Sequence, residues 1–88
     1  MLDDVKQDAL KRLSYLAGHL EGVRRMIESD AYCPDVLKQT YAVRKAISKL
    51  ETRILEGHLN SCVAEGMRDG RQEEVVSELM ELYEVANR

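Results

Sequence analysis

Apolar residues recur at spacings of three and four along three segments of this 88-residue chain, and no segment shows the alternation typical of a strand. The first amphipathic segment covers about residues 3–27, the second about 34–65 and the third about 72–86. Pro34 suits the first turn of the second segment, and residues 29–31 and 66–71 supply the breaks on either side of it. The pattern predicts an all-α fold in which three helices form a single domain.

The second predicted helix is long for so small a chain. Its 32 or so residues would span roughly 48 Å, whereas a compact domain of this length has a radius of gyration of only about 12 Å. The helix must therefore extend beyond any compact monomer, and its apolar face needs cover from another chain. We expect a homo-oligomer in which copies of this helix pack antiparallel as a helical bundle.

Composition narrows the class of protein further. The chain has no Phe or Trp, so its core must be built from aliphatic residues and a few Tyr. It has no run of about 18 apolar residues that would cross a membrane, and its mixed, acidic start does not resemble a signal peptide. We therefore expect a cytoplasmic protein whose two cysteines serve as thiols, metal ligands or redox groups rather than as a structural disulfide.

The candidate chemistry lies on the second helix. His58 and Cys62 are four residues apart and share one face, where an imidazole and a thiolate can both bind a metal. Cys33 begins the same helix, roughly 37 Å from His58 if the helix is continuous. The three residues can meet only between two antiparallel chains, with Cys33 from one and His58 and Cys62 from the other. A surface histidine and a half-buried core cysteine remain the alternative interpretation.

Two thiolates and one imidazole are soft donors, which favour Cu(I), or Zn(II) if a fourth ligand is added. The second ring nitrogen of a ligating His58 would need an acceptor. Tyr32 and Glu78 are candidates, although spacing alone fits equally a loop aromatic and a solvated carboxylate.

Basic residues form a stripe on the second helix at Lys45, Lys49 and Arg53. An antiparallel dimer would duplicate the stripe, which could then follow a phosphate backbone. The net charge of -3 is uneven, because residues 1–55 hold ten basic against eight acidic residues and residues 56–88 three against eight. The sequence has no helix-turn-helix pattern, zinc-finger spacing or basic leucine zipper, so a solvated charged face is the alternative interpretation.

Enzyme functions are disfavoured by the sequence. It contains no Ser-His-Asp set, no Gly-rich phosphate loop and no His-Glu-x-x-His motif. The second histidine, His19, is interpreted as structural or exposed rather than as a ligand. We expect neither catalysis nor a small-molecule substrate.

The segments LKRLSYLAGHLEGVRRMIE, YCPDVLKQTYAVRKAISKL and EGHLNSCV resemble the CsoR/RcnR family of bacterial metal-responsive repressors. The resemblance covers nearly the whole chain and is most specific in the Cys33–His58–Cys62 spacing. It implies three helices per chain and antiparallel dimers that pair into tetramers. It also implies binding to operator DNA that is weakened by an inducer held between subunits.

The ligand set matches the copper(I)-sensing type of that family, because no histidine occurs in the first eighteen residues. The resemblance also implies that Tyr32 and Glu78 support the ligating His58 and that Arg12 and Lys49 contact DNA. His19 departs from the family, which usually has Gln there, and the third helix is unusually acidic. Three alternatives stay open, namely a persulfide or electrophile sensor, a sensor of another metal, and a metal-binding bundle without a DNA role.

Overall fold

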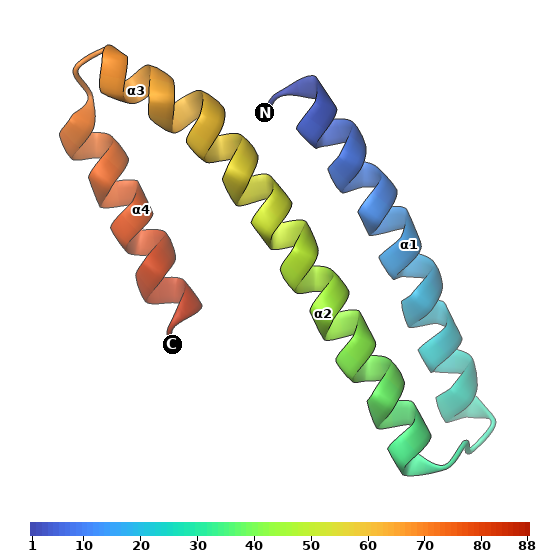
Figure 1. Ribbon diagram of the computed structural model, residues 1–88. Coiled ribbons are helices and arrows are strands. Elements are labelled where there is room, and N and C mark those ends of the chain that lie inside the picture. The colour runs from blue at the N-terminus through green and yellow to red at the C-terminus, as the bar shows by residue number, and fades with distance from the viewer.

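The computed structural model describes all 88 residues, and every regular element in it is helical. The chain forms a long first helix, a longer second rod and a short last helix, which turn back on one another (Figure 1). These elements are α1 (Asp3–Glu28), α2 (Cys33–His58), the π-helical turn η1 (Leu59–Val63), α3 (Ala64–Arg68) and α4 (Gln72–Ala86). The all-α fold of three helical rods expected from the sequence is confirmed.

The second rod runs from Cys33 to Arg68 as α2, η1 and α3 joined without a loop (Figure 1). The sequence predicted this helix over about 34–65, so the observed rod is slightly longer than expected. Its one irregularity is η1, in which the backbone widens into a π turn, a feature that occurs often at functional sites. Gly57 lies just before that turn and does not end the helix.

Both turns between the rods use a residue with positive φ. Asp30 has φ 56° after α1, and Gly70 has φ 79° after α3. In each case the following backbone N–H reaches back five residues, from Ala31 to the carbonyl of Met26 (2.9 Å) and from Arg71 to that of Gly66 (2.8 Å). These bonds satisfy carbonyls left free at the helix ends and reverse the chain direction sharply.

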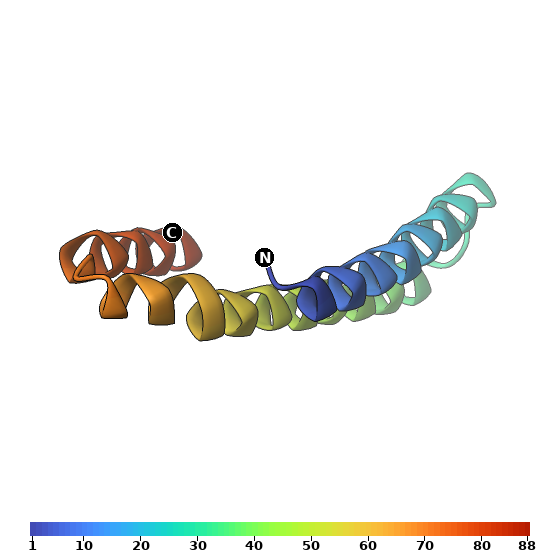
Figure 2. The ribbon, with the colours of Figure 1, turned by 90° about the horizontal axis from the view of Figure 1, so that it is seen from above.

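The three rods lie side by side in one thin, curved layer (Figures 1 and 2). α1 runs antiparallel along nearly the whole of α2, so that Val5 meets Gly57, and α4 folds back along the opposite edge of the rod near η1 (Figure 1). The Cα atoms extend over 56 × 29 × 13 Å, with a radius of gyration of 17.4 Å. That radius is well above the roughly 12 Å of a compact domain of this size, so the chain is an extended layer.

A few contacts between apolar side chains and glycines hold the helices of the layer together. Leu16 and Val23 of α1 pack against Val43 of α2 as the main buried cluster. Val5 is only 1% exposed because it sits against Gly57, where a Cβ would lie 2.7 Å from its Cγ2 atom. Glycine is therefore required at position 57 by the close approach of α1, and Gly66 meets Val75 of α4 in the same way.

Most apolar side chains are not covered within one chain. Only seven of the 88 residues are buried, and twenty large hydrophobic residues are exposed. Leu13, Leu20 and Ile27 recur every seven residues along α1 and are 52%, 53% and 60% exposed. Such a heptad stripe is the pattern of a helix that packs against another helix, and nothing within the chain covers it.

None of the helices combines the length and the apolar character that crossing a membrane requires.

We predict that Gly57→Ala lowers the free energy of unfolding by about 1–3 kcal/mol, because the new methyl group overlaps Val5. The loss should occur although alanine favours a helix by up to ~1 kcal/mol over glycine. Urea denaturation followed by circular dichroism measures the effect. Val5→Ala removes the overlapping methyl groups, so the double variant should lose clearly less than the sum of the two single losses; simple additivity would show that no such contact exists.

Candidate metal and nucleic-acid sites

Cys33 is the first residue of α2, where the chain leaves the turn after α1. Its thiol is free and exposed, and Pro34 fixes the backbone at the next position. Tyr32 precedes it as the helix cap and is 74% exposed. This end of the rod therefore presents one thiol and one phenol to the surroundings.

His58 and Cys62 lie at the other end of α2, the cysteine within the π turn η1. The Cys62 thiol is free and exposed. Ser61 donates its hydroxyl proton to the Gly57 carbonyl (2.7 Å), and its Oγ lies 3.8 Å from the Cys62 Sγ atom. The hydroxyl thus satisfies the Gly57 carbonyl beside the widened turn.

Glu78 of α4 approaches His58 from the adjacent rod. Its Oε2 atom lies 4.0 Å from the His58 Nε2 atom, within ion-pair range but beyond a hydrogen bond. α4 is held there by the close contact of Val75 with Gly66. The carboxylate therefore faces one ring nitrogen, which leaves Nδ1 as the nitrogen available for another ligand. The sequence named Glu78 as a candidate partner of His58, and the structure brings the two side chains together.

The two ends of α2 do not meet within one chain. Cys33 and His58 begin and end the same continuous helix of 26 residues, which places them roughly 37 Å apart. No three His, Cys, Asp or Glu side chains of a single chain lie together in a way that could hold a metal ion. Tyr32 is likewise far along the helix from His58. Each chain thus offers two separate parts of a soft donor set, and those parts fit one ion only if two chains contribute.

A groove between α1 and α2 gathers basic side chains, and we call it the basic groove. Its volume is about 600 Å³. None of its lysines makes an ion pair within the chain, in contrast to its arginine. The residues that line it are Asp8, Lys11, Arg12 and Tyr15 of α1 and Ala42, Lys45, Ala46 and Lys49 of α2. The structure therefore brings Arg12, Lys45 and Lys49 of the predicted DNA-binding set into one place.

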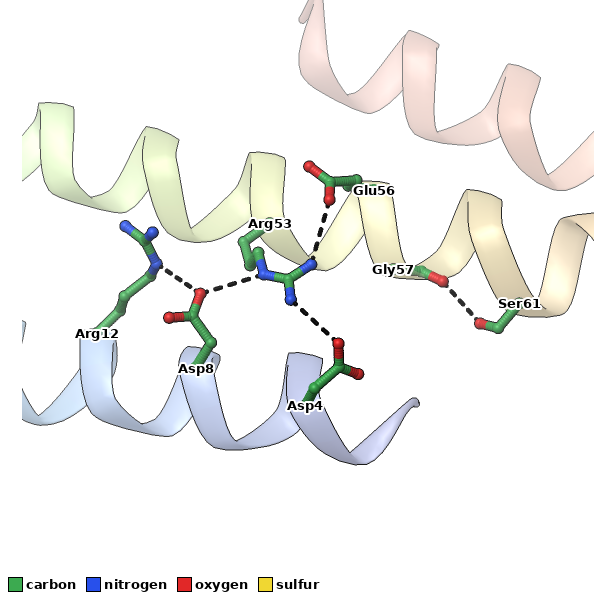
Figure 3. Close-up of polar contacts among 7 residues, drawn as sticks. All are labelled: Asp4, Asp8, Arg12, Arg53, Glu56, Gly57 and Ser61. Atoms are coloured by element: carbon green, nitrogen blue, oxygen red, sulfur yellow. Dashed lines mark hydrogen bonds and ion pairs between the residues drawn. The ribbon is translucent and has the colours of Figure 1, made fainter.

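Arg53, the fourth residue of that set, is engaged differently. All three of its side-chain nitrogens face carboxylates: Nε lies 3.2 Å from Asp8, Nη1 3.3 Å from Glu56 and Nη2 3.6 Å from Asp4 (Figure 3). Its side chain is only 24% exposed. The stripe along α2 could not reveal this, because two of the carboxylates come from α1.

Asp8 is shared between two arginines. Its Oδ2 atom accepts hydrogen bonds from the Nε atoms of Arg12 (2.9 Å) and Arg53 (3.2 Å) (Figure 3). The hydrogen bond from Arg12, more than the charge of either arginine, lowers the pKa of Asp8 below its ordinary 3.8. Sequence reasoning missed Asp8, although its i, i+4 spacing to Arg12 was a signal that could have drawn attention to the pair.

His19 takes no part in the metal-binding ends. Its Nε2 atom lies 2.8 Å from the Oε1 atom of Gln39, and the hydrogen bond links α1 to α2. The structural interpretation of this histidine agrees with that contact.

Comparisons with known proteins agree with one another. Residues 5–85 match the family model of the metal-sensitive transcriptional repressors. The copper-sensing transcriptional repressor CsoR of Mycobacterium ulcerans is 42% identical over 80 residues, which cover 91% of this chain and 68% of that protein. The chain spans about two thirds of the length of such mycobacterial relatives.

Two solved structures have a similar fold. The crystal structure of the copper-sensing repressor CsoR with Cu(I) from Geobacillus thermodenitrificans matches with a TM-score of 0.94 at 32% identity, over 100% of this chain and 92% of that chain. The nickel-responsive transcriptional regulator InrS matches with a TM-score of 0.78 at 36% identity, over 89% and 88% of the two chains. The extended layer is therefore a known arrangement of three helices.

We predict that the contribution of Asp8 to stability depends on pH. Because its folded-state pKa is lowered, the carboxylate stabilises the folded protein above its unfolded pKa, and this stabilisation disappears as the pH falls through the folded pKa. Asp8→Asn should therefore be less stable than the parent at about pH 6 and nearly equal to it at about pH 2–3, as measured by urea unfolding. Asp3→Asn, at a carboxylate without an ion pair, is the control; a gap for Asp8→Asn that does not change with pH would contradict the assignment.

Proposed function

Because the chain belongs to the family of metal-sensitive transcriptional repressors, we propose that it is a copper(I)-sensing repressor acting in the cytoplasm. It binds operator DNA in the metal-free state and is released when Cu(I) binds between subunits. The observation that carries the proposal is the placement of two free, exposed thiols and one imidazole at opposite ends of α2. The proteins named as its copper-sensing relatives support the choice of metal.

The proposed metal site lies between two chains. When two α2 helices pack antiparallel, the beginning of one lies beside the end of the other. Cys33 of the partner subunit then approaches His58 and Cys62, and twofold symmetry produces two such sites per dimer. Glu78 faces the Nε2 atom of His58 and leaves Nδ1 for the metal, and the Cys62 thiol is exposed, so both groups are open to this approach.

The chemistry of the donors fits Cu(I). Two thiolates and one imidazole form a soft set of three ligands, which suits a monovalent, soft ion better than Mg²⁺ or Ca²⁺. Bound there, Cu(I) would cross-link two chains and fix the orientation of the imidazole. Both thiols are exposed, so they are open to the ion before the site is assembled.

The uncovered apolar surface supports a homodimer that pairs further into a homotetramer. The heptad stripe of α1 is free to pack against the same stripe of a second copy. A separate apolar hollow of about 580 Å³ lies between α2 and α4, lined by residues such as Leu55, Leu79 and Leu82. Two uncovered apolar surfaces on different edges of the layer fit two kinds of contact, as a dimer of dimers requires.

The basic groove is the proposed contact with operator DNA. Lys11, Arg12, Lys45 and Lys49 meet there with one acidic residue among them, so the groove is basic although the whole chain carries a net charge of -3. Lysine and arginine side chains bind phosphates and release counterions, which makes such binding strongly dependent on salt. Antiparallel packing of two chains would place a second basic groove on the partner and so extend the basic surface available to DNA.

His58 and Glu78 are the proposed link between metal and DNA. Once one ring nitrogen is a ligand, the other is fixed as a donor and draws Glu78 and α4 toward α2. The 4.0 Å separation is short enough to close by a small side-chain movement. The two states then differ in one specific hydrogen bond, and a ligand shifts a conformational equilibrium only through such a difference.

A sensor of another metal is the second candidate. The similarity to a nickel-responsive regulator favours it, and His19 is a further imidazole on the chain. Nickel(II) would require more nitrogen or oxygen ligands than Cys33, His58 and Cys62 provide. His19 is bonded to Gln39 and belongs to a different part of the surface from His58.

We predict that the purified protein retards a DNA fragment from upstream of its own gene in a gel-shift assay and that stoichiometric Cu(I) abolishes this retardation.

Mixing Cys33→Ala and Cys62→Ala chains should restore one complete site in each heterodimer, whereas neither variant alone binds Cu(I) with three ligands. X-ray absorption of the mixture should show two sulfurs and one nitrogen around copper. Release by Ni(II) but not by Cu(I) would favour the second candidate, and heterodimers without an intact site would refute the shared site.

We predict that Glu78→Gln keeps copper affinity and metal-free DNA binding while losing most of the copper-driven release. Coupling energies between two sites are commonly about 1–3 kcal/mol, so the ratio of operator affinities with and without Cu(I) should fall by roughly tenfold. Glu74→Gln is the matched control, because it lies one turn earlier on α4 and makes no ion pair. Operator release equal to that of the parent would exclude this route.

A further inference from the structure

One acidic side chain stands inside the basic groove, which is unexpected for a surface that binds phosphate. Asp8 lines the groove together with Lys11, Arg12 and Lys49. Its Oδ2 atom is bound by Arg12 of its own helix and by Arg53 of α2 (Figure 3). A carboxylate at this place repels the phosphates of DNA, so its presence is favourable only if it also strengthens a contact between another side chain and DNA.

The contact with Arg12 is made at one end of the guanidinium group only. The Nε atom of Arg12 donates to Asp8 at 2.9 Å, while its two terminal nitrogens make no hydrogen bond or ion pair within the chain (Figure 3). Arg12 lines both the basic groove and the neighbouring hollow that contains Lys49 and Thr52. A guanidinium group held at Nε keeps its terminal fork free for the two-bond contact that arginine makes with phosphate.

Arg53 holds the carboxylate in place from the opposite helix. Each of its nitrogens already faces an acidic side chain, and it is largely covered. With each nitrogen facing a carboxylate and only 24% of its side chain exposed, Arg53 is poorly placed to contact DNA, in spite of its position on the basic stripe of α2. What it does is fix Asp8 between α1 and α2.

We propose that Asp8 is a positioning residue for DNA binding, which orients Arg12 toward phosphate and is itself held by Arg53. The inference rests on the proposed function, since it concerns the same groove and the same partner. Arg12 is then the residue that touches DNA, and Asp8 and Arg53 act only through it. In this proposal Arg53, which the sequence predicted to contact DNA, does not contact DNA directly.

Asp8 can affect the affinity for DNA in two opposite ways, so a single substitution decides which of them dominates. If the carboxylate only repels phosphate, Asp8→Asn removes a negative charge and strengthens binding. If the carboxylate orients Arg12, Asp8→Asn loses a charge-assisted hydrogen bond, and Arg12 spends less time in the competent orientation. We expect the second effect to dominate and the operator affinity to fall about threefold to tenfold at fixed salt.

The experiment is a fluorescence-anisotropy titration of the metal-free full chain against a labelled duplex from upstream of its own gene. Asp4→Asn is the matched control, because it removes the same charge from the same helix and touches Arg53 but not Arg12. It should change the affinity by less than about twofold, as is usual for a screened, exposed charge. An Asp8→Asn protein that binds as tightly as the parent, or more tightly, overturns the proposal.

Substitution in a variant without Arg12 separates positioning from a general loosening of the helix pair. In an Arg12→Ala protein there is no guanidinium to orient, so adding Asp8→Asn should not weaken binding further. A loss as large as in the parent background would mean that Asp8 acts by holding α1 to α2, and would overturn the proposal. The unfolding midpoint of each variant, measured alongside, reports any loss of structure.

A second pair of variants tests the role of Arg53. Arg53→Gln should weaken binding in the parent background and have no further effect in the Asp8→Asn background. A further loss there would mean that Arg53 contacts phosphate itself, which contradicts the proposal. If the parent chain binds no operator DNA, the proposed function and this inference fall together; if the parent binds and is released by Cu(I) but Asp8→Asn has no effect, only this inference fails.

Discussion

The unbroken helical backbone of the second rod is the constraint on which the rest of the structure depends. From Cys33 to Arg68 the backbone remains helical, and no loop allows the two ends to fold together. The soft donors at the two ends of α2 are therefore kept apart within a chain. The same rod is too long to be covered by α1 and α4, which leaves apolar surface on both edges of the layer. One geometric fact thus supports both the proposed assembly and the proposed metal site.

In the proposed function, the rod carries residues for both metal binding and DNA binding within a short distance. Arg53 lies five residues before His58 on α2 and is bonded across to α1. Glu78 approaches the same stretch from α4. In the proposed function, a change at the end of α2 would reach α1 through the ion pairs of Arg53 and α4 through the contact of His58 with Glu78. The π turn at Leu59–Val63 adds a place where the backbone departs from a regular helix.

Sequence periodicity was sufficient for the helices and their breaks, because apolar spacing and the residues of the turns are local properties. Three features could not be predicted in this way, and two of them depend on contacts between helices. The π turn has no clear signal in residues 59–63, the requirement for glycine at position 57 comes from Val5 on another helix, and the carboxylates around Arg53 come mainly from α1. The spacing of Cys33 and His58 nevertheless indicated a site between chains, because helix length converts directly into distance.

Anomalous diffraction from crystals grown with Cu(I) tests directly whether the metal site is shared between two chains. We expect one copper peak per chain, bonded to the Sγ atom of Cys62 from one subunit and to that of Cys33 of the partner subunit. A copper peak whose protein ligands all belong to one chain, or one that lies away from Cys33, would contradict this expectation.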